Sequence, residues 1–286
     1  MQYGLELPIG GLFADVAFLG ELAGLAEQAG WEGVFLEDYI VHHIEPDAPT
    51  CDPWVALTAM TLATERVRLG TMVTALSRRR PWKVARETVS LDRLSGGRLV
   101  LGVGLGDGSD PGIRSVSEQR DARVRARRLD EALDVLVGLW SGERFSYQGE
   151  HFDIDDLKFL PTPVQTRRIP IWVGGNWPHR GPIRRAARWD GFVGGKVAGK
   201  DGQWCLSADE LRRLKEDIAA HRTSEQRFDV ALGGAARGRI TGDVERDRTW
   251  IGELAAAGAT WWMEYVWAGD RKSISEAVTR GPLRAD

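Results

Sequence analysis

The segment 92–106 constrains the fold of this chain more than any other feature. It joins the end of a helix to a Gly-Gly turn and then to a strand that is apolar on both faces. A strand of this kind must be buried on both faces, which is typical of a parallel sheet covered by helices. The glycines at its carboxyl end, Gly102, Gly104 and Gly106, allow a large group to approach the backbone. In α/β proteins this is the end of the sheet where ligands bind.

Apolar runs of strand length alternate with segments of helical periodicity along the chain. The expected strands are 3–9, 33–37, 67–75, 98–103, 169–173, 191–193, 228–232 and 260–266. The expected helices are 16–29, 53–64, 81–94, 117–140, 182–187, 207–221, 244–257 and 273–280. Eight strand–helix units predict the α/β fold class and, at this length, a (β/α)8 TIM barrel. The alternative is an open doubly wound sheet, although the first strand lacks the glycine fingerprint of a dinucleotide-binding unit.

One segment, 141–168, interrupts this alternation. Its residues 145–152 predict a short hairpin around Gln148 and Gly149, outside the main fold. We therefore expect one barrel domain over residues 1–286, with a small hairpin insertion around 141–168.

The composition excludes several classes of partner. The formal net charge of −3 gives no reason to expect binding to nucleic acid or to an anionic membrane. No apolar run reaches the roughly 18–20 residues of a membrane span, and the first residues lead directly into a strand instead of a signal peptide. Two cysteines, Cys51 and Cys205, are too few for a disulfide framework or a zinc knuckle. These features predict a soluble cytoplasmic protein.

In a barrel, the residues that follow each strand meet at one rim. The second strand is followed by a loop of about a dozen residues, a length that is usually functional or mobile. This loop carries Asp38, Tyr39, His42 and His43. The alternative is a solvated loop in which the histidines have no chemical role. No metal site is expected, because adjacent histidines cannot readily face one ion and no third ligand is suitably spaced.

Charged groups also follow the third and fourth strands. The arginine run 78–80 fits either a solvated helix start or a cationic rim for a phosphorylated or carboxylated ligand. Asp107 follows the fourth strand in a glycine-rich loop. At a barrel rim such a carboxyl group can be a general acid whose pKa is raised by burial, and the alternative is an ordinary turn aspartate.

Two glycine pairs follow the fifth and sixth strands. They are Gly174-Gly175, with Asn176 next to it, and Gly194-Gly195. Glycine pairs on neighbouring strand ends expose backbone N–H groups beside a helix N-terminus, which is how a phosphate is commonly held. The later βα loops of barrels often carry such sites, so these pairs predict a phosphate site.

Several motifs are more specific than any single rim residue. They are Leu-Ser-Gly-Gly-Arg at 94–98, Leu-Gly-Val-Gly at 101–104, Arg-Leu-Gly-Thr at 68–71, Pro-Ile-Trp-Val-Gly-Gly at 170–175 and Ala-Ala-Arg-Trp-Asp-Gly at 186–191. With these motifs the chain resembles the bacterial-luciferase-like superfamily of flavin- and deazaflavin-dependent oxidoreductases. The resemblance covers about residues 3–195 well and the remainder weakly.

The resemblance implies a (β/α)8 barrel that binds FMN or the deazaflavin coenzyme F420 at its carboxyl rim. The tricyclic ring of the cofactor commonly leans on a bulge in the third strand that contains a non-prolyl cis peptide, here expected between Met72 and Val73. The cofactor phosphate would lie near the two glycine pairs. The expected cofactor contacts are Asp38, Met72, Val73, Thr74, Leu105, Gly106, Gly174, Gly175, Asn176, Gly194 and Gly195.

The resemblance also implies candidate catalytic residues, namely Asp107, His43 and Tyr39. Asp107 falls where some members carry a glutamate that donates a proton, and Asp38 sits where deazaflavin members place an aspartate against the ring. The chain departs from the pattern at Tyr39, where many members have histidine. The luciferases have a histidine base at the position of Asp38. His43 is a candidate imidazole from further along the loop.

These expectations lead to three functional hypotheses. The first is an oxidoreductase that moves a hydride between a flavin-type cofactor and a small organic substrate, with F420 favoured by Asp38. The second is a monooxygenase that uses reduced FMN and oxygen. A separate flavin or F420 reductase is an expected partner, because no nicotinamide fingerprint is visible. The third is a catalytically silent flavin-binding barrel. Family members are often dimers, so a homodimer is expected, and the sequence does not name the substrate.

Overall fold

The computed structural model describes residues 1–42, 45–108, 110–198, 205–233, 243–266 and 269–285. Its barrel strands are β1 (Gln2–Leu7), β2 (Gly33–Leu36), β3 (Arg68–Ala75), β4 (Leu99–Gly104), β7 (Ile171–Trp177), β8 (Gly191–Lys196), β9 (Asp229–Gly233) and β10 (Trp261–Tyr265). The helices are α1 (Val16–Gln28), α2 (Pro53–Leu62), α3 (Pro81–Leu94), α4 (Pro111–Arg114), α5 (Ala122–Trp140), α6 (Arg180–Ala186), α7 (Ala208–Ala219), α8 (Val244–Ala257) and α9 (Arg271–Thr279). Two 3-10 helices, η1 (Gly11–Ala14) and η2 (Leu76–Arg78), follow β1 and β3.

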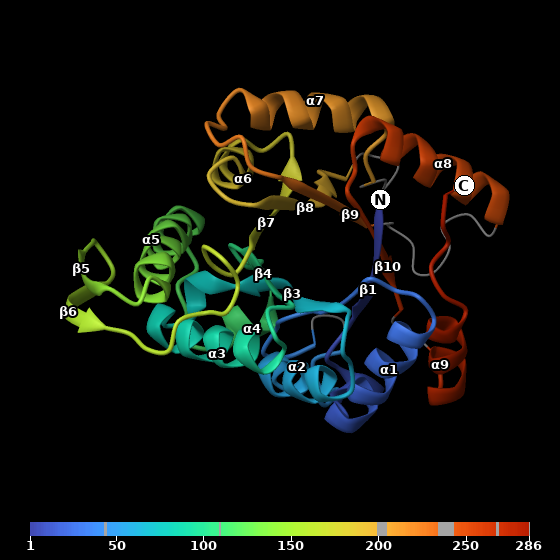
Figure 1. Cartoon of the computed structure of the whole chain (residues 1–286), viewed down its shortest axis with the longest axis horizontal. Coiled ribbons are helices and arrows are strands. Elements are labelled where there is room, and N and C mark those ends of the chain that lie inside the picture. The colour runs from blue at the N-terminus through green and yellow to red at the C-terminus, as the bar shows by residue number, and fades with distance from the viewer. Residues whose placement is uncertain (43–44, 109, 199–204, 234–242, 267–268, 286) are drawn as a thin grey trace.

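The strands form a closed parallel barrel in the order β1-β10-β9-β8-β7-β4-β3-β2 (Figure 1). The first and last strands pair in parallel from Gln2–Trp261 to Glu6–Tyr265, which closes the barrel. The predicted (β/α)8 barrel is therefore confirmed, and the open doubly wound sheet is excluded. Within the described residues, no helix combines the length and the apolar character that crossing a membrane requires.

Aspartate side chains determine where several helices begin. The Asp52 carboxylate accepts the backbone N–H groups of the first turn of α2, and Asp121 does the same for α5. Such caps satisfy donors that have no partner within the helix. The expected helix 117–140 is wrong at its start for this reason, because Asp121 caps a helix that begins at Ala122.

The barrel interior toward the amino ends of the strands is filled by large side chains. The rings of Phe35, Trp172 and Trp261 lie with centroids 5.4–5.8 Å apart. Each is at most 2% exposed. Glycine makes this possible at Gly33, where an added Cβ would lie 2.7 Å from Phe35 and 2.9 Å from Trp261. With the base of the barrel packed in this way, the open space lies at the carboxyl ends of the strands.

The predicted hairpin insertion is confirmed. Strands β5 (Arg144–Gln148) and β6 (Asp153–Lys158) pair antiparallel in a separate two-stranded sheet. Figure 1 shows this hairpin projecting beyond α5, away from the barrel strands.

The segment that returns from the hairpin is held by a buried carboxylate. Asp92, near the end of α3, is fully buried and accepts hydrogen bonds from the backbone N–H groups of Val164 (2.8 Å) and Gln165 (3.3 Å). It also accepts one from the side-chain amide of Gln165 (2.7 Å). Replacement by alanine would remove the acceptor that these part-buried donors share.

Asp92→Ala is therefore expected to lower the free energy of unfolding by about 3 kcal/mol, since each buried unsatisfied donor costs roughly 1–3 kcal/mol. Urea denaturation measures this change. Glu143→Ala, at an exposed position, is the control and should leave stability unchanged. Equal stability of the two variants would show that the Asp92 contacts contribute nothing.

Candidate active site

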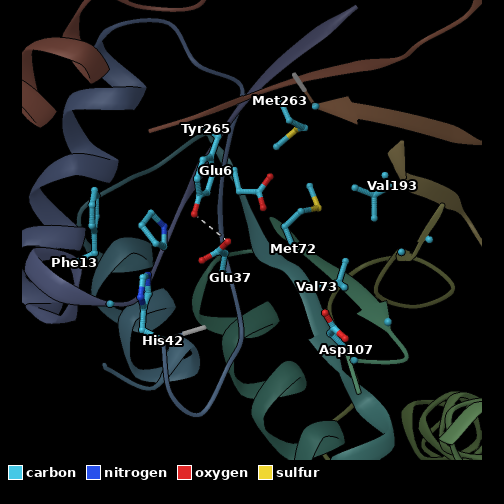
Figure 2. A pocket seen from close by; sticks show the side chains of 18 of the residues that line it. Glu6, Phe13, Glu37, His42, Met72, Val73, Asp107, Val193, Met263 and Tyr265 are labelled. Atoms are coloured by element: carbon cyan, nitrogen blue, oxygen red, sulfur yellow. Dashed lines mark hydrogen bonds between the residues drawn. The ribbon is translucent and has the colours of Figure 1, made fainter. Parts of the chain in front are cut away.

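A cavity of about 1060 Å³ opens at the carboxyl end of the barrel strands (Figure 2). Its walls come from β1, β3, β4, β7, β8, β9 and β10 and from the segments that follow β1, β2, β4 and β10. Figure 2 shows the side chains of Met72, Val193 and Met263 around the cavity together with several carboxyl groups. The volume is sufficient for a cofactor-sized ligand, because ligand pockets commonly measure about 300–1,000 Å³.

A bulge in β3 forms one wall of the cavity. The pairing of β3 with β4 shifts register between Thr71 and Thr74. The Met72–Val73 peptide is cis, as expected. The glycines of neighbouring strands accommodate the Val73 side chain: an added Cβ would lie 2.6 Å from it at Gly104 and 3.0 Å from it at Gly174. The space at these two glycines is therefore taken largely by the bulge, and the bulge in turn faces the cavity.

The glycine-rich ends of β7 and β8 form another wall. Residues 174–176 were expected in a loop but continue β7, because they pair with β8 as far as Trp177 and Lys196. The pairing of β4 with β7 ends at Val103 and Val173. Beyond that point β7 has a ladder partner on one side only, which leaves its other edge to face a ligand. Of the predicted contacts here, Gly174, Gly175, Asn176 and Gly194 line the cavity, whereas the buried Gly195 lies outside its lining.

The loop after β4 brings three predicted residues to the cavity: Leu105, Gly106 and Asp107. Arg125, a buried residue of α5, donates a hydrogen bond to the carbonyl oxygen of Gly106 (2.8 Å). The Ser77 hydroxyl donates to the carbonyl oxygen of Leu105 (3.0 Å). Both contacts are made to the backbone, so they do not depend on the identity of the exposed side chain at Asp107.

Asp38 lies outside the cavity lining, in contrast to its expected contact with a ring. Its carboxylate accepts hydrogen bonds from Arg78 (2.6 Å) and Arg79 (2.8 and 3.1 Å). The carboxylate is fully buried and the two arginine side chains are 7% and 19% exposed. Arg78 and Arg79 therefore form neither a solvated helix start nor a free cationic rim, whereas the exposed Arg80 lies at the solvated start of α3. Arg78 and Arg79 neutralise Asp38 and join the loop after β2 to the end of β3.

Other predicted residues support the site from outside. The Tyr39 hydroxyl accepts a hydrogen bond from the Ile9 N–H (3.1 Å), and the Tyr39 ring packs edge-on against His42. Burial raises the pKa of Tyr39, so its hydroxyl is protonated at neutral pH. Thr74 is fully buried and donates to the Thr71 hydroxyl (3.0 Å). His42 lines the cavity, whereas His43 lies outside the described residues.

Glu6, Glu37 and Tyr265 are among the cavity-lining residues that were not predicted from the sequence. The Tyr265 hydroxyl donates a hydrogen bond to Glu37 (3.0 Å). Burial and the nearby Glu37 carboxyl raise the pKa of Glu6 to about 8. Burial likewise raises the pKa of Glu37 to about 7. The sequence does carry a signal for the two glutamates. A lone acid inside an apolar strand is not expected to face the covering helices, so it is expected to face the barrel interior.

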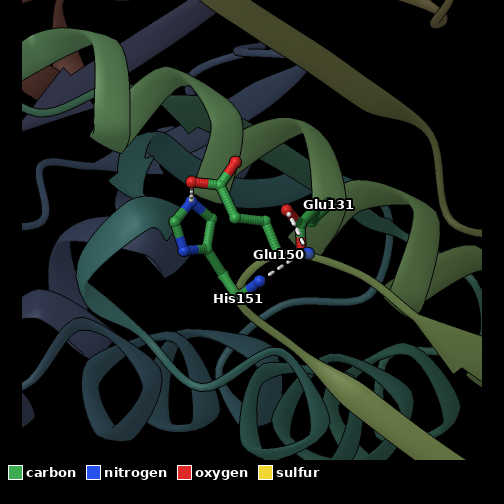
Figure 3. A group of neighbouring side chains, drawn as sticks. All are labelled: Glu131, Glu150 and His151. Atoms are coloured by element: carbon green, nitrogen blue, oxygen red, sulfur yellow. Dashed lines mark hydrogen bonds and ion pairs between the residues drawn. The ribbon is translucent and has the colours of Figure 1, made fainter.

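One group of side chains outside the cavity has the spacing of metal ligands. Figure 3 shows Glu131, Glu150 and His151, whose ligand atoms all lie within 4.8 Å of one another. Glu131 accepts the backbone N–H groups of Glu150, His151 and Phe152 (2.9–3.3 Å). Glu150 pairs with Arg127. Because these carboxylates already have donors, we assign the group to anchoring the hairpin turn on α5.

Residues 5–237 match the family model described as luciferase-like monooxygenase. The chain belongs to the luciferase-like monooxygenase family. This confirms the resemblance inferred from the motifs at 68–71, 94–104 and 170–175.

Curated relatives cover part of the chain. An F420-dependent glucose-6-phosphate dehydrogenase of Microbacterium testaceum is 36% identical over 157 residues, which span 54% of this chain and 45% of that protein. A second dehydrogenase of the same name, from Kineococcus radiotolerans, is 31% identical over 218 residues, or 75% and 62% of the two chains. The chain therefore spans about half to three fifths of the length of these dehydrogenases.

Solved structures support the fold over the full length. An F420-dependent secondary alcohol dehydrogenase in complex with an F420-acetone adduct superimposes with a TM-score of 0.79 at 17% identity, covering 100% of this chain and 99% of that one. The monooxygenase RslO1 from Streptomyces bottropensis has a TM-score of 0.76 at 19% identity, covering 97% and 96%. At these identities the likeness concerns the fold alone.

Proposed function

We propose that the cavity binds F420 or FMN and that the protein is an oxidoreductase acting on a small organic substrate, with F420 favoured. The observation that carries this proposal is the bulge of β3, whose Val73 side chain lines the cavity between Gly104 and Gly174. The preference for F420 rests on relatives that are named F420-dependent dehydrogenases. Asp38 does not support this preference, because its carboxylate is paired with two arginines.

The residues present fit such a cofactor. Met72 and Val73 supply an apolar wall for a flat ring, and the proposed phosphate site is the wall lined by Gly174, Gly175 and Gly194. When bound, the cofactor supplies the transfer of a hydride. The protein binds and orients the reactants and restricts water. Asp107, on a loop held by its backbone, is the proposed group that holds or releases a proton at the rim.

Turnover under controlled oxygen tests this proposal and its alternative. With F420 and a panel of small alcohols and carbonyl compounds, we expect the F420 absorbance to change without oxygen. A monooxygenase would instead require reduced FMN and oxygen, and a reductase that supplies reduced FMN. Absence of turnover under both conditions, with cofactor bound, would favour the silent flavin-binding barrel. The reductase partner and the homodimer remain predictions.

The phosphate site predicts the effect of one added charge. Asn176 lines the cavity and is exposed, so Asn176→Asp changes the charge without disturbing the core. Repulsion between the new carboxylate and the cofactor phosphate is expected to weaken binding of the phosphorylated cofactor about tenfold. Binding of the phosphate-free form should change little, and fluorescence titration measures both. Equal weakening of the two forms would place the phosphate elsewhere.

A further inference from the structure

We propose that Glu6 and Glu37 act together as an acid pair that gives a proton to the substrate, and that Tyr265 positions Glu37. This inference rests on the proposed function, because it assigns the proton that accompanies hydride transfer. It adds a second proton-carrying group to the cavity besides Asp107. Three neighbouring strands, β10, β1 and β2, bring these residues together.

The barrel register brings the three residues together. Strand β1 pairs with β10 and with β2, so β1 lies between them. Glu6 of β1 pairs with Tyr265 on one side and with Phe35 on the other. Phe35 faces the barrel interior, and Glu37 lies two residues further along, on the same face of the strand. All three side chains therefore point into the mouth of the barrel.

The hydrogen bonding leaves these acids available to a substrate. Glu37 accepts one hydrogen bond from Tyr265, while its other oxygen, Oε2, is buried without a partner. In the described part of the chain, neither Glu6 nor Glu37 forms an ion pair with a basic residue. The buried carboxylate of Asp38, by contrast, is neutralised by two arginines. An acid pair held without a cation is expected to retain a proton.

The residues that line the cavity also favour the protonated form of the two acids. The other titratable residues among the described residues lining the cavity are His42, Glu45, Asp107 and Tyr265, and none of these described residues is a lysine or arginine. Burial and the mutual repulsion of the two carboxyls raise the pKa of Glu6 to about 8, and burial raises that of Glu37 to about 7. Tyr39 and Tyr265 stay protonated, because burial raises their pKa as well.

The acid pair and Asp107 occupy different parts of the cavity. In Figure 2, Glu6, Glu37 and Tyr265 lie together on one side of Met72, and Asp107 lies on the other side, beside Val73. A ligand seated on the bulge would thus have a separate proton-carrying group at each end. This separation makes it possible to test the two groups independently.

With a carbonyl substrate, the proposed step is a reduction to the alcohol. The substrate carbon accepts a hydride from the reduced cofactor, which is oxidised by two electrons and releases one proton through Asp107 to solvent. The acid pair gives one proton to the carbonyl oxygen, so the C=O π bond is lost and C–H and O–H bonds form. The pair is left one proton short and regains it from solvent. In the reverse direction, the pair accepts the proton of an alcohol.

The first test uses the protein without cofactor. Infrared spectroscopy detects the carbonyl stretch of protonated carboxylic acids, and we expect such a band at pH 6 that is lost by about pH 9. Glu37→Gln and Glu6→Gln should each diminish the band, whereas the exposed control Glu143→Gln should leave it unchanged. An unchanged band in both pair variants would overturn the proposal.

The Tyr265→Phe variant tests whether Tyr265 positions Glu37, because the pH midpoint of the carboxyl band should then shift in a defined direction. The hydrogen bond from Tyr265 stabilises the charged form of Glu37 and so lowers its pKa relative to burial alone. Removing the hydroxyl is expected to raise the pH at which the carboxyl band is lost. A purely structural role for Tyr265 would leave that midpoint in place, which would contradict the positioning role.

Protein stability provides a third readout. Both pKa values lie above the ordinary value of 4.5, so the folded protein binds more protons than the unfolded chain in this range. The resulting stabilisation is complete below pH 4.5 and is lost as the pH rises through about 7 and 8. We expect the unfolding midpoint of the wild type to fall from pH 6 to pH 9. The fall should be smaller in Glu37→Gln, and equal falls would count against the acid pair.

Turnover then separates this inference from the proposed function. With cofactor bound, Glu37→Gln is expected to lower turnover by roughly 10²-fold. Failure of the protein to bind either cofactor would overturn the proposed function without affecting the infrared result. Normal binding with unchanged turnover in Glu37→Gln and Glu6→Gln would overturn the acid pair alone.

Discussion

Asp107→Asn is expected to lower turnover by roughly 10²–10⁴-fold while cofactor affinity stays within about threefold of the wild type. Asparagine has the size of aspartate but carries no acidic proton. The loop should keep its shape, because Arg125 and Ser77 hold it through the carbonyl oxygens of Gly106 and Leu105. Steady-state turnover and fluorescence titration of the same protein preparation measure the two quantities.

Asp107→Glu is the matched variant, because it restores a carboxyl group on a side chain that is one methylene longer. It should recover part of the activity lost in Asp107→Asn. Unchanged turnover in the asparagine variant would show that Asp107 is an ordinary turn residue. Loss of cofactor binding equal to the loss of turnover would assign Asp107 to binding rather than to proton transfer.

Gly104→Val is expected to weaken cofactor binding by about 100-fold or more, which corresponds to about 2.7 kcal/mol. An added Cβ at this position would lie 2.6 Å from Cγ2 of Val73. The valine side chain must therefore push Val73 and the bulge of β3 out of place. If the bulge is the seat of the ring, this shift removes the apolar wall on which the ring rests.

Gly181→Val is the control for this substitution, since nothing lies within 4 Å of an added Cβ at Gly181. Both variants should have thermal unfolding midpoints that show a folded barrel, and Gly104→Ala should weaken binding less than Gly104→Val. Wild-type affinity in a folded Gly104→Val variant would mean that the ring rests elsewhere.

Periodicity alone was enough to predict the barrel, because each strand is a compact apolar run between helices with recognisable caps. The ends of β7 and β8 were harder to predict. Gly174, Gly175 and Asn176 have the composition of a loop, yet they pair with β8 because the backbone ladder needs no side chains. The helix start at Ala122 was missed because Asp121 was not identified as its cap.

The site was predicted only in part, for reasons of pairing and burial. The bulge at Met72–Val73 followed from the family resemblance and is present. Asp38 follows a strand at the rim, but its position in the sequence does not reveal that Arg78 and Arg79 cover it. Glu6 lies inside an apolar strand, and only the register with β10 shows that it meets Tyr265.

The central claim is that the cavity beside Val73 binds a flavin-type cofactor, and an equilibrium titration tests it most directly. The purified protein, free of cofactor, is titrated with F420 and with FMN while fluorescence quenching is followed. We predict saturable one-to-one binding of F420 with a micromolar or lower dissociation constant, weaker binding of FMN, and loss of both in Gly104→Val. Binding of neither cofactor, or binding that Gly104→Val leaves unchanged, would contradict the claim.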